Sequence, residues 1–128
     1  MKKIFFHLSL SILFSGMISA VNAQNSVLDW AVNIGSTSFD VALSTAVDGS
    51  GNVYTAGYFQ GTADFDPGPG IVALTATTSG YDTGIGKLDT DGNYIWVKQI
   101  YGSANAIALD PDGNVYTTGS FGGNVDFD

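Results

Sequence analysis

The sequence contains no cysteine, no glutamate and no arginine, and its one histidine, His7, lies close to the N-terminus. Without cysteine there is no disulfide framework, and without cysteine and further histidines there is no ordinary zinc site. Catalysis would therefore rest on aspartate, serine, threonine, tyrosine or lysine. The 128 residues carry a formal net charge of −8. That charge repels phosphate backbones, so nucleic acid is excluded as an expected partner.

Residues 1–23 have the pattern of a signal peptide. A basic start is followed by an apolar stretch over 4–17 and then by small residues suited to cleavage after Ala23, or after Ala20. The alternative is a membrane anchor, but this stretch is short for a spanning helix. We therefore expect a secreted or cell-surface chain that begins near Gln24 and has no membrane span. Only two of the four lysines but all twelve aspartates fall in 24–128, which gives that part a net charge of −10.

The chain repeats itself at an offset of 62 residues. The segment AVDGSGNVYTAGYF over 46–59 aligns without a gap with ALDPDGNVYTTGSF over 108–121, and 61–66 aligns with 123–128. A weaker match joins Trp30-Ala31-Val32-Asn33-Ile34 to Trp96-Val97-Lys98-Gln99-Ile100. A fixed period of this size indicates stacked supersecondary units.

Within each 62-residue period, the residue pattern predicts β-strands separated by turns. The pattern predicts four antiparallel strands at 42–48, 53–59, 83–89 and 94–100, separated by breaks of Asp, Gly and Asn that suit tight turns. Outside the leader no stretch has helical apolar spacing. Four short strands per repeat are typical of a β-propeller blade. The expected fold class is therefore all-β, with antiparallel β-propeller blades: about one and a half blades plus an N-terminal strand.

Three segments resemble a known family: AVDGSGNVYTAGYF, KLDTDGNYIWVKQIYG and ALDPDGNVYTTGSF are similar to the bacterial SBBP β-propeller repeat, with a strand pattern like that of NHL-type blades. The resemblance covers about 25–128 and implies a secreted or surface-associated repeat protein. Because propellers have about 4 to 8 blades, we expect an N-terminal fragment. Its β-propeller repeat region, 24–128, would hold a first blade at about 42–100 and a partial second blade at about 106–128. Residues 27–34 would then be the last strand of a blade completed beyond Asp128.

Acidic residues in two settings are candidate calcium ligands. The turns Asp89–Asn93 and Asp110–Asn114 place glycine at the fourth position, where an EF-hand has it at the sixth, which favours aspartates that cap the turn backbone. Asp64 and Asp66 alternate along an extended segment and could hold calcium or form an acid/base pair. The alternative is a rigid loop that packs Phe65 into the seam between blades. Recurrence of this motif at 126–128 favours architecture, so no catalytic, cofactor-binding or metal-binding residue is assigned and no cofactor is expected.

Aromatic residues and long loops are the remaining candidates for a binding site. Trp30 and Trp96 could be sugar-stacking platforms, but their equivalent places in apolar segments favour core packing, as for Tyr54 and Tyr116. The connections Gly35–Val41 and Gln60–Tyr81 are long and lie at the same end of the strands. Since binding residues usually lie on such loops, we expect any ligand site there.

The sequence thus predicts a secreted β-propeller repeat protein that acts as a non-catalytic binding or structural module. Its partner would be an unknown extracellular protein or glycan. One alternative is a calcium-stabilised adhesion or carbohydrate-binding propeller. The other is a propeller enzyme whose catalytic residues lie in downstream blades.

Overall fold

The computed structural model describes residues 28–77 and 80–120, which form three antiparallel sheets without a helix. The predicted signal peptide and the repeated motif at 123–128 lie outside these residues. The strands are β1 (Asp40–Val47), β2 (Val53–Phe59), β3 (Thr62–Asp64), β4 (Ala73–Thr75), β5 (Asp82–Leu88), β6 (Tyr94–Tyr101), β7 (Ser103–Leu109) and β8 (Val115–Ser120). The described part holds no helical segment that is long and apolar enough to cross a membrane. The predicted all-β fold class is confirmed.

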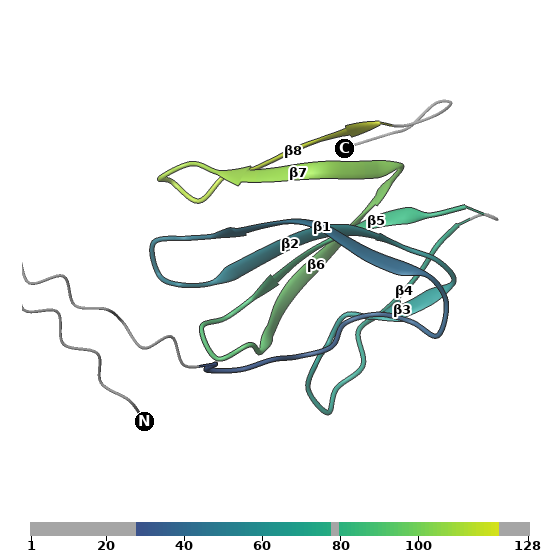
Figure 1. The fold of residues 1–128 in the computed structure, drawn as a ribbon, viewed down its shortest axis with the longest axis horizontal. Helices are drawn as coiled ribbons and strands as arrows, with labels where there is room; N and C mark the ends of the chain where they lie inside the picture. Colours follow the sequence, from purple (N-terminus) through teal and green to yellow (C-terminus); the bar gives the residue numbers. More distant parts are fainter. Residues whose placement is uncertain (1–27, 78–79, 121–128) are drawn as a thin grey trace, which may run out of the picture.

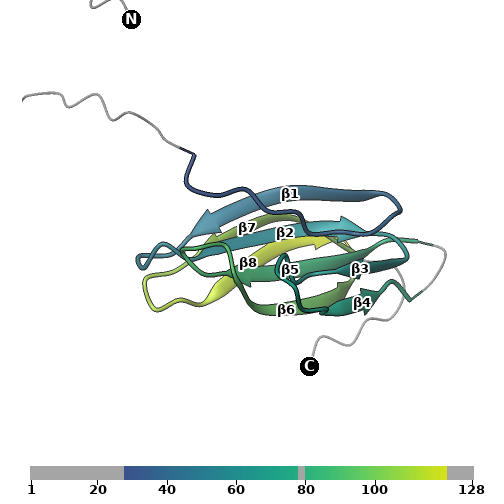
Figure 2. The same ribbon diagram turned by 90° about the horizontal axis from the view of Figure 1, so that it is seen from below.

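The largest sheet has four strands in the order β1-β2-β5-β6, each antiparallel to its neighbour (Figures 1 and 2). All four predicted strands are confirmed, and their observed ends lie within two residues of the predicted ones. In the register, Thr55 of β2 lies between Thr45 of β1 and Gly86 of β5. This simple up-and-down order follows from the tight turns, which join only neighbouring strands.

The two faces of this sheet differ in what covers them. On the inner face, Tyr54, Ala56 and Ile85 are buried beneath β7, the first strand of the next repeat, through Ala104 and Ile107. The outer face contains Thr55, Gly57, Gly84 and Gly86, which line a pocket of about 160 Å³. The inner face therefore holds the main hydrophobic cluster, which lies between two repeats, while Phe59 and Leu88 are buried on the outer face.

Strand β7 crosses the inner face obliquely, as Figure 1 shows above the first sheet. It starts next to β5, where the Ala104 N–H donates to Thr83 Oγ1 at 2.9 Å. It then reaches β1, where the Ile107 N–H donates to Ser44 Oγ at 3.3 Å. Strands β7 and β8 form a two-stranded sheet that corresponds to the first half of a second blade. The two repeats thus stack face to face.

A β-bulge recurs at the same place in both repeats. The register shifts between Ala42 and Ser44 in β1 and between Ala104 and Ala106 in β7, an offset of 62 residues. A glycine lies opposite each bulge, Gly57 in the first repeat and Gly119 in the second. The sequence repeat is therefore also a repeat of local geometry.

The connection from β2 to β5 differs from the prediction of a plain long loop. It contains the hairpin β3–β4, in which Ala63 is opposite Leu74. The pairing continues past the strands through a 2.9 Å hydrogen bond from the Phe65 N–H to the Val72 carbonyl. Strands of three residues are too short to show an alternating pattern in the sequence, so the hairpin was not predicted.

Residues 28–34 form no strand with the other described residues; the predicted strand at 27–34 was expected to pair with residues beyond Asp128, so that pairing is not tested. Trp30 Nε1 donates to the Thr90 carbonyl at 2.8 Å, and Gly35 exchanges two backbone hydrogen bonds with Asp64. Ile34 and Gly35 line the outer-face pocket. The segment therefore runs past the β5–β6 turn and the outer face, and it reaches the edge of β3 only at the bridge between Gly35 and Asp64.

Candidate functional site

One end of the fold, the turn end, carries three turns of the same construction: Asp48–Asn52, Asp89–Asn93 and Asp110–Asn114. In each, the glycine before the final asparagine has a positive φ of 83° to 88°, which a residue with a side chain rarely adopts. In the second turn, one oxygen of Asp89 accepts hydrogen bonds from the Asp91 and Asn93 N–H groups at 2.9 and 2.8 Å. Its other oxygen accepts one from Asn93 Nδ2 at 2.9 Å. The predicted capping of the turn backbone is confirmed here and at Asp110.

These hydrogen bonds stabilise the charged form of each capping aspartate. The side chain of Asn52, with backbone N–H groups of Asn52 and Ser50, lowers the pKa of Asp48 well below its usual range. Asn93 lowers the pKa of Asp89 in the same way, through its side chain first and then its backbone N–H. The carboxylates are therefore already used by the turns. Among residues 28–77 and 80–120, no group of three His, Cys, Asp or Glu side chains converges on a possible metal position.

We expect the fold to lose stability below about pH 4. Each capping aspartate has a lower pKa folded than unfolded, so the stabilisation is complete above the unfolded pKa of about 3.9. It is lost as the pH falls towards the folded value. Denaturant titrations between pH 2.5 and 7 should show a smaller acid-induced loss for Asp89→Asn than for the wild type. Asp91→Asn is the control, since its carboxylate accepts no hydrogen bond from the described residues; an equal change in both variants would contradict the capping argument.

The two equivalent tyrosines have different surroundings. Tyr54 is 3% exposed, packs edge-on against Trp96 at 5.9 Å, and has Lys87 Nζ 4.7 Å from its ring centre. Lys87 also forms an ion pair of 3.4 Å with Asp48. Tyr116 is 57% exposed, so its predicted packing role is wrong in the described structure. The reason is that the first tyrosine is flanked by β5 and covered by β7, whereas the second has only β7 beside it.

In the loop that contains Asp64 and Asp66, both carboxylates accept hydrogen bonds from backbone N–H groups of the same loop. Asp64 Oδ1 accepts hydrogen bonds from the N–H groups of Asp66 and Val72 at 3.0 and 2.9 Å, and these bonds lower the pKa of Asp64. Asp66 Oδ1 accepts one from the Gly68 N–H at 2.8 Å. Phe65 packs edge-on against Phe59 at 5.2 Å. Phe65 thus packs on the first sheet, over Phe59 and Gly84, whereas its predicted place in a seam between two blades is not tested by the described residues. The hydrogen bonds of Asp64 and Asp66 to their own loop give the acid/base pair no support.

The two tryptophans do not occupy equivalent places. Trp96 lies in β6 and packs against the core, as predicted. The prediction is wrong for Trp30, whose ring lies over the turn glycine Gly92, 3.0 Å from the position that a Cβ would take there. The offset of 66 residues between the tryptophans, rather than 62, is the one sequence signal of this difference.

Comparison of equivalent residues in the two repeats explains why the outer face has a pocket. In the second repeat, Ala104 and Ile107 are 5% and 9% exposed because they contact the first sheet. Their equivalents in β1, Ala42 and Thr45, are exposed. The outer face therefore has the composition of a surface that contacts another repeat, and its pocket carries no cluster of polar groups that would hold a small ligand.

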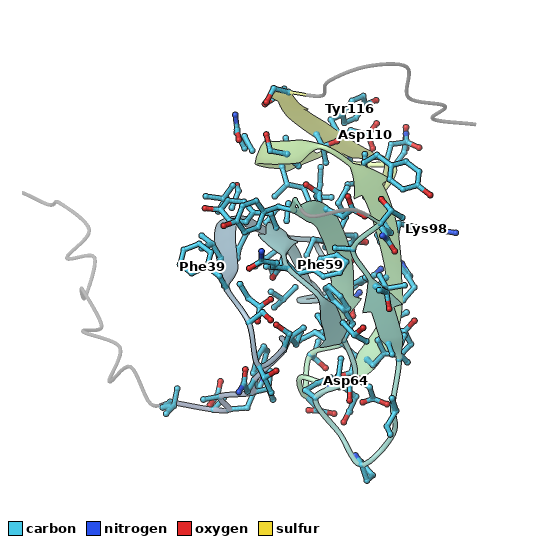
Figure 3. The ribbon with its side chains drawn as sticks, turned by 90° about the vertical axis from the view of Figure 1, so that its right-hand side faces the viewer. Phe39, Phe59, Asp64, Lys98, Asp110 and Tyr116 are labelled. Carbon is cyan, nitrogen blue, oxygen red and sulfur yellow. The ribbon has the colours of Figure 1, made fainter. Side chains whose placement is uncertain are left out.

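The opposite end of the strands, the loop end, carries the long connections 35–39 and 60–81. There Phe39, Tyr58 and Tyr81 form an aromatic patch, with ring centres 6.2 Å apart for Phe39 and Tyr58 and 5.0 Å apart for the tyrosines. In Figure 3, Phe39 stands at the outside of the fold, whereas Phe59 lies within it. Phe39 is 55% exposed and Tyr81 48% exposed. The sequence placed a ligand site at this end but did not single out these three residues; their positions at the borders of the long connections were the available signal.

Comparison with known proteins gives one curated relative of interest. The chain is similar to a WD repeat protein. That relative is an uncharacterized WD repeat-containing protein from Acanthamoeba polyphaga mimivirus, and it is 29% identical to this chain over 111 residues. The match covers 72% of this chain and only 8% of that relative. No protein-family model matches the chain, and no solved structure matches it significantly.

Proposed function

We propose that this chain is part of an exported β-propeller that binds a protein ligand at its loop end and does not itself catalyse a reaction. The observation that carries the proposal is the cluster of three aromatic side chains, Phe39, Tyr58 and Tyr81, at the loop end, whereas the exposed Tyr116 at the turn end is hydrogen-bonded to Asp110 of its own turn. All three turns of the turn end are closed by internal hydrogen bonds, whereas Phe39 and Tyr81 at the loop end are about half exposed. Loops on a rigid scaffold are where binding residues are concentrated.

The WD repeat relative supports a protein-interaction role, since stacked blades with variable loops are well suited to holding other chains. The leader pattern of residues 1–23 and the resemblance to SBBP-type repeats support export to the cell surface or medium. The exported chain would begin near Gln24. The stacked repeats and the exposed outer face support further blades beyond those described.

The alternatives have less support. For a calcium site or an acid/base pair, Asp64 and Asp66 would have to give up hydrogen bonds to the backbone of their own loop. For catalysis from downstream blades, the described residues supply no supporting observation. A sugar platform at Trp30 would use a ring that instead covers the β5–β6 turn.

Site-specific photo-cross-linking in the cells that produce the protein would test the proposal. A photoreactive residue replaces Ser38, which is exposed at the loop end, or Ser50, which is exposed at the turn end. We expect polypeptide adducts of the exported protein from the first position and none from the second. Equal adducts from both positions, or a product that retains Lys2 and Lys3 inside the cell, would contradict the proposal.

A further inference from the structure

The aromatic patch (Phe39, Tyr58 and Tyr81) is assembled from three separate segments. Phe39 precedes β1, Tyr58 lies near the end of β2, and Tyr81 precedes β5. Tyr81 meets Phe39 at 69° and Tyr58 at 66°, so both contacts are edge-to-face. Rings that hold one another in this way lose little freedom when a ligand binds, which favours affinity.

The charge around this patch is negative. Asp40 and Asp82 follow Phe39 and Tyr81 directly in the sequence, at the starts of β1 and β5. Neither lysine of the described residues lies there. Lys87 pairs with Asp48 at the turn end, and Lys98 is opposite Ile85 in the middle of β6.

The carboxylates beside the patch accept hydrogen bonds within the fold and have few free acceptor positions. Asp40 accepts hydrogen bonds from the backbone N–H and hydroxyl of Ser36, the shortest of them 2.6 Å. Asp82 is 5% exposed and accepts from the N–H and hydroxyl of Thr77 and from Gln99 Nε2. Sugar hydroxyls need several free hydrogen-bonding groups beside an aromatic ring, and the two carboxylates next to this patch are occupied, which leaves the tyrosine hydroxyls. A cation needs only the negative potential and the faces of the rings.

We propose that the aromatic patch binds arginine or lysine side chains of an extended basic segment in a partner protein. This deepens the proposed function by naming the chemistry of its ligand. The cation stacks on the exposed faces of Phe39 and Tyr81, and the nearby aspartates attract it over a longer range. Arginine is favoured because its planar guanidinium stacks on rings and is weakly hydrated.

Binding of defined peptides to the full-length protein tests this proposal. The probe is a flexible Gly-Ser peptide with four arginines, and its control replaces each arginine by citrulline, which has nearly the same shape without the charge. We expect the arginine peptide to bind, the citrulline peptide to bind about tenfold more weakly or not at all, and added salt to weaken binding.

Two sets of variants assign the binding to the patch. Phe39→Ser/Tyr81→Ser should weaken binding of the arginine peptide about tenfold, because two ring faces are lost. Phe39→Leu/Tyr81→Leu keeps an apolar surface without aromatic rings and should show a similar loss, which separates ring chemistry from misfolding. Tyr116→Ser removes an aromatic side chain of matching exposure at the turn end and should leave binding unchanged.

Three results would overturn the inference. One is equal binding of the arginine and citrulline peptides, and another is unchanged binding in both double variants. The third is binding of a chitin hexasaccharide that depends on Phe39 and Tyr81 when the arginine peptide does not bind. If polypeptide adducts still form at Ser38 in the double variants, the proposed function stands and only this assignment of the ligand fails.

Discussion

Gly57→Ala should lower the free energy of unfolding by about 3 kcal/mol, as expected for a side chain forced into a filled space. An added Cβ would overlap the Val41 carbonyl oxygen and lie 2.9 Å from Ala42 Cα, both in the backbone of the neighbouring bulge. Backbone atoms held in a ladder move only with the whole strand. Urea unfolding followed by circular dichroism would measure the loss, and Gly119→Ala should behave similarly because its Cβ would overlap the Ser103 carbonyl oxygen.

Gly86→Ala is the matched control, in the strand beside Gly57 and on the same outer face. The nearest atom to its added Cβ is the Trp96 carbonyl oxygen at 3.9 Å, an ordinary contact. Since glycine inside a strand costs about 0.5–1 kcal/mol relative to alanine, this substitution should be neutral or slightly stabilising. Equal losses for Gly57→Ala and Gly86→Ala would show that the bulge does not impose the requirement for glycine.

Thr83→Val should cost about 3 kcal/mol, although the two side chains have almost the same shape. Thr83 is fully buried, and its hydroxyl donates to the Gly102 carbonyl at 2.7 Å and accepts from the Ala104 N–H at 2.9 Å. Valine leaves the buried Ala104 N–H and the part-buried Gly102 carbonyl without this partner, and each buried group left unpaired costs about 1–3 kcal/mol. The same denaturant titrations would measure this loss.

Thr83→Ser is the control for the hydroxyl group. Serine keeps both hydrogen bonds and removes only one methyl group, so its cost should be about 1 kcal/mol. A valine variant as stable as the serine variant would mean that other groups, or water, satisfy the link between β6 and β7.

The strands and turns were predictable because their signals are local. Alternating β-branched and aromatic residues give β2 and β6, and the aspartate of each turn bonds to groups two and four residues further on. Contacts set by neighbours in space were not predictable. Tyr54 and Tyr116 have the same local sequence, Gly-Asn-Val-Tyr-Thr, yet one is buried and the other exposed. The difference lies in which strands surround each ring.

At the loop end, too, the local features were predictable from the sequence and the contacts between distant residues were not. The antiparallel order of the strands puts both long connections at the same end of the sheet, as the sequence predicted. The aromatic patch depends on register, since Phe39, Tyr58 and Tyr81 meet only when β1, β2 and β5 are aligned as observed. The path of residues 28–34 depends on a sheet face and the β5–β6 turn, neither of which has a signature in the segment itself.

The single residue between β6 and β7 has a geometric consequence for the whole assembly. Gly102 joins the two sheets, and the hydroxyl of Thr83 fixes the Gly102 carbonyl and the Ala104 N–H that follows it. Because β7 leaves this point obliquely across the inner face, the second repeat is rotated relative to the first by a set angular step. If later repeats are joined in the same way, that step, rather than any contact between distant parts, decides how many of them complete a ring.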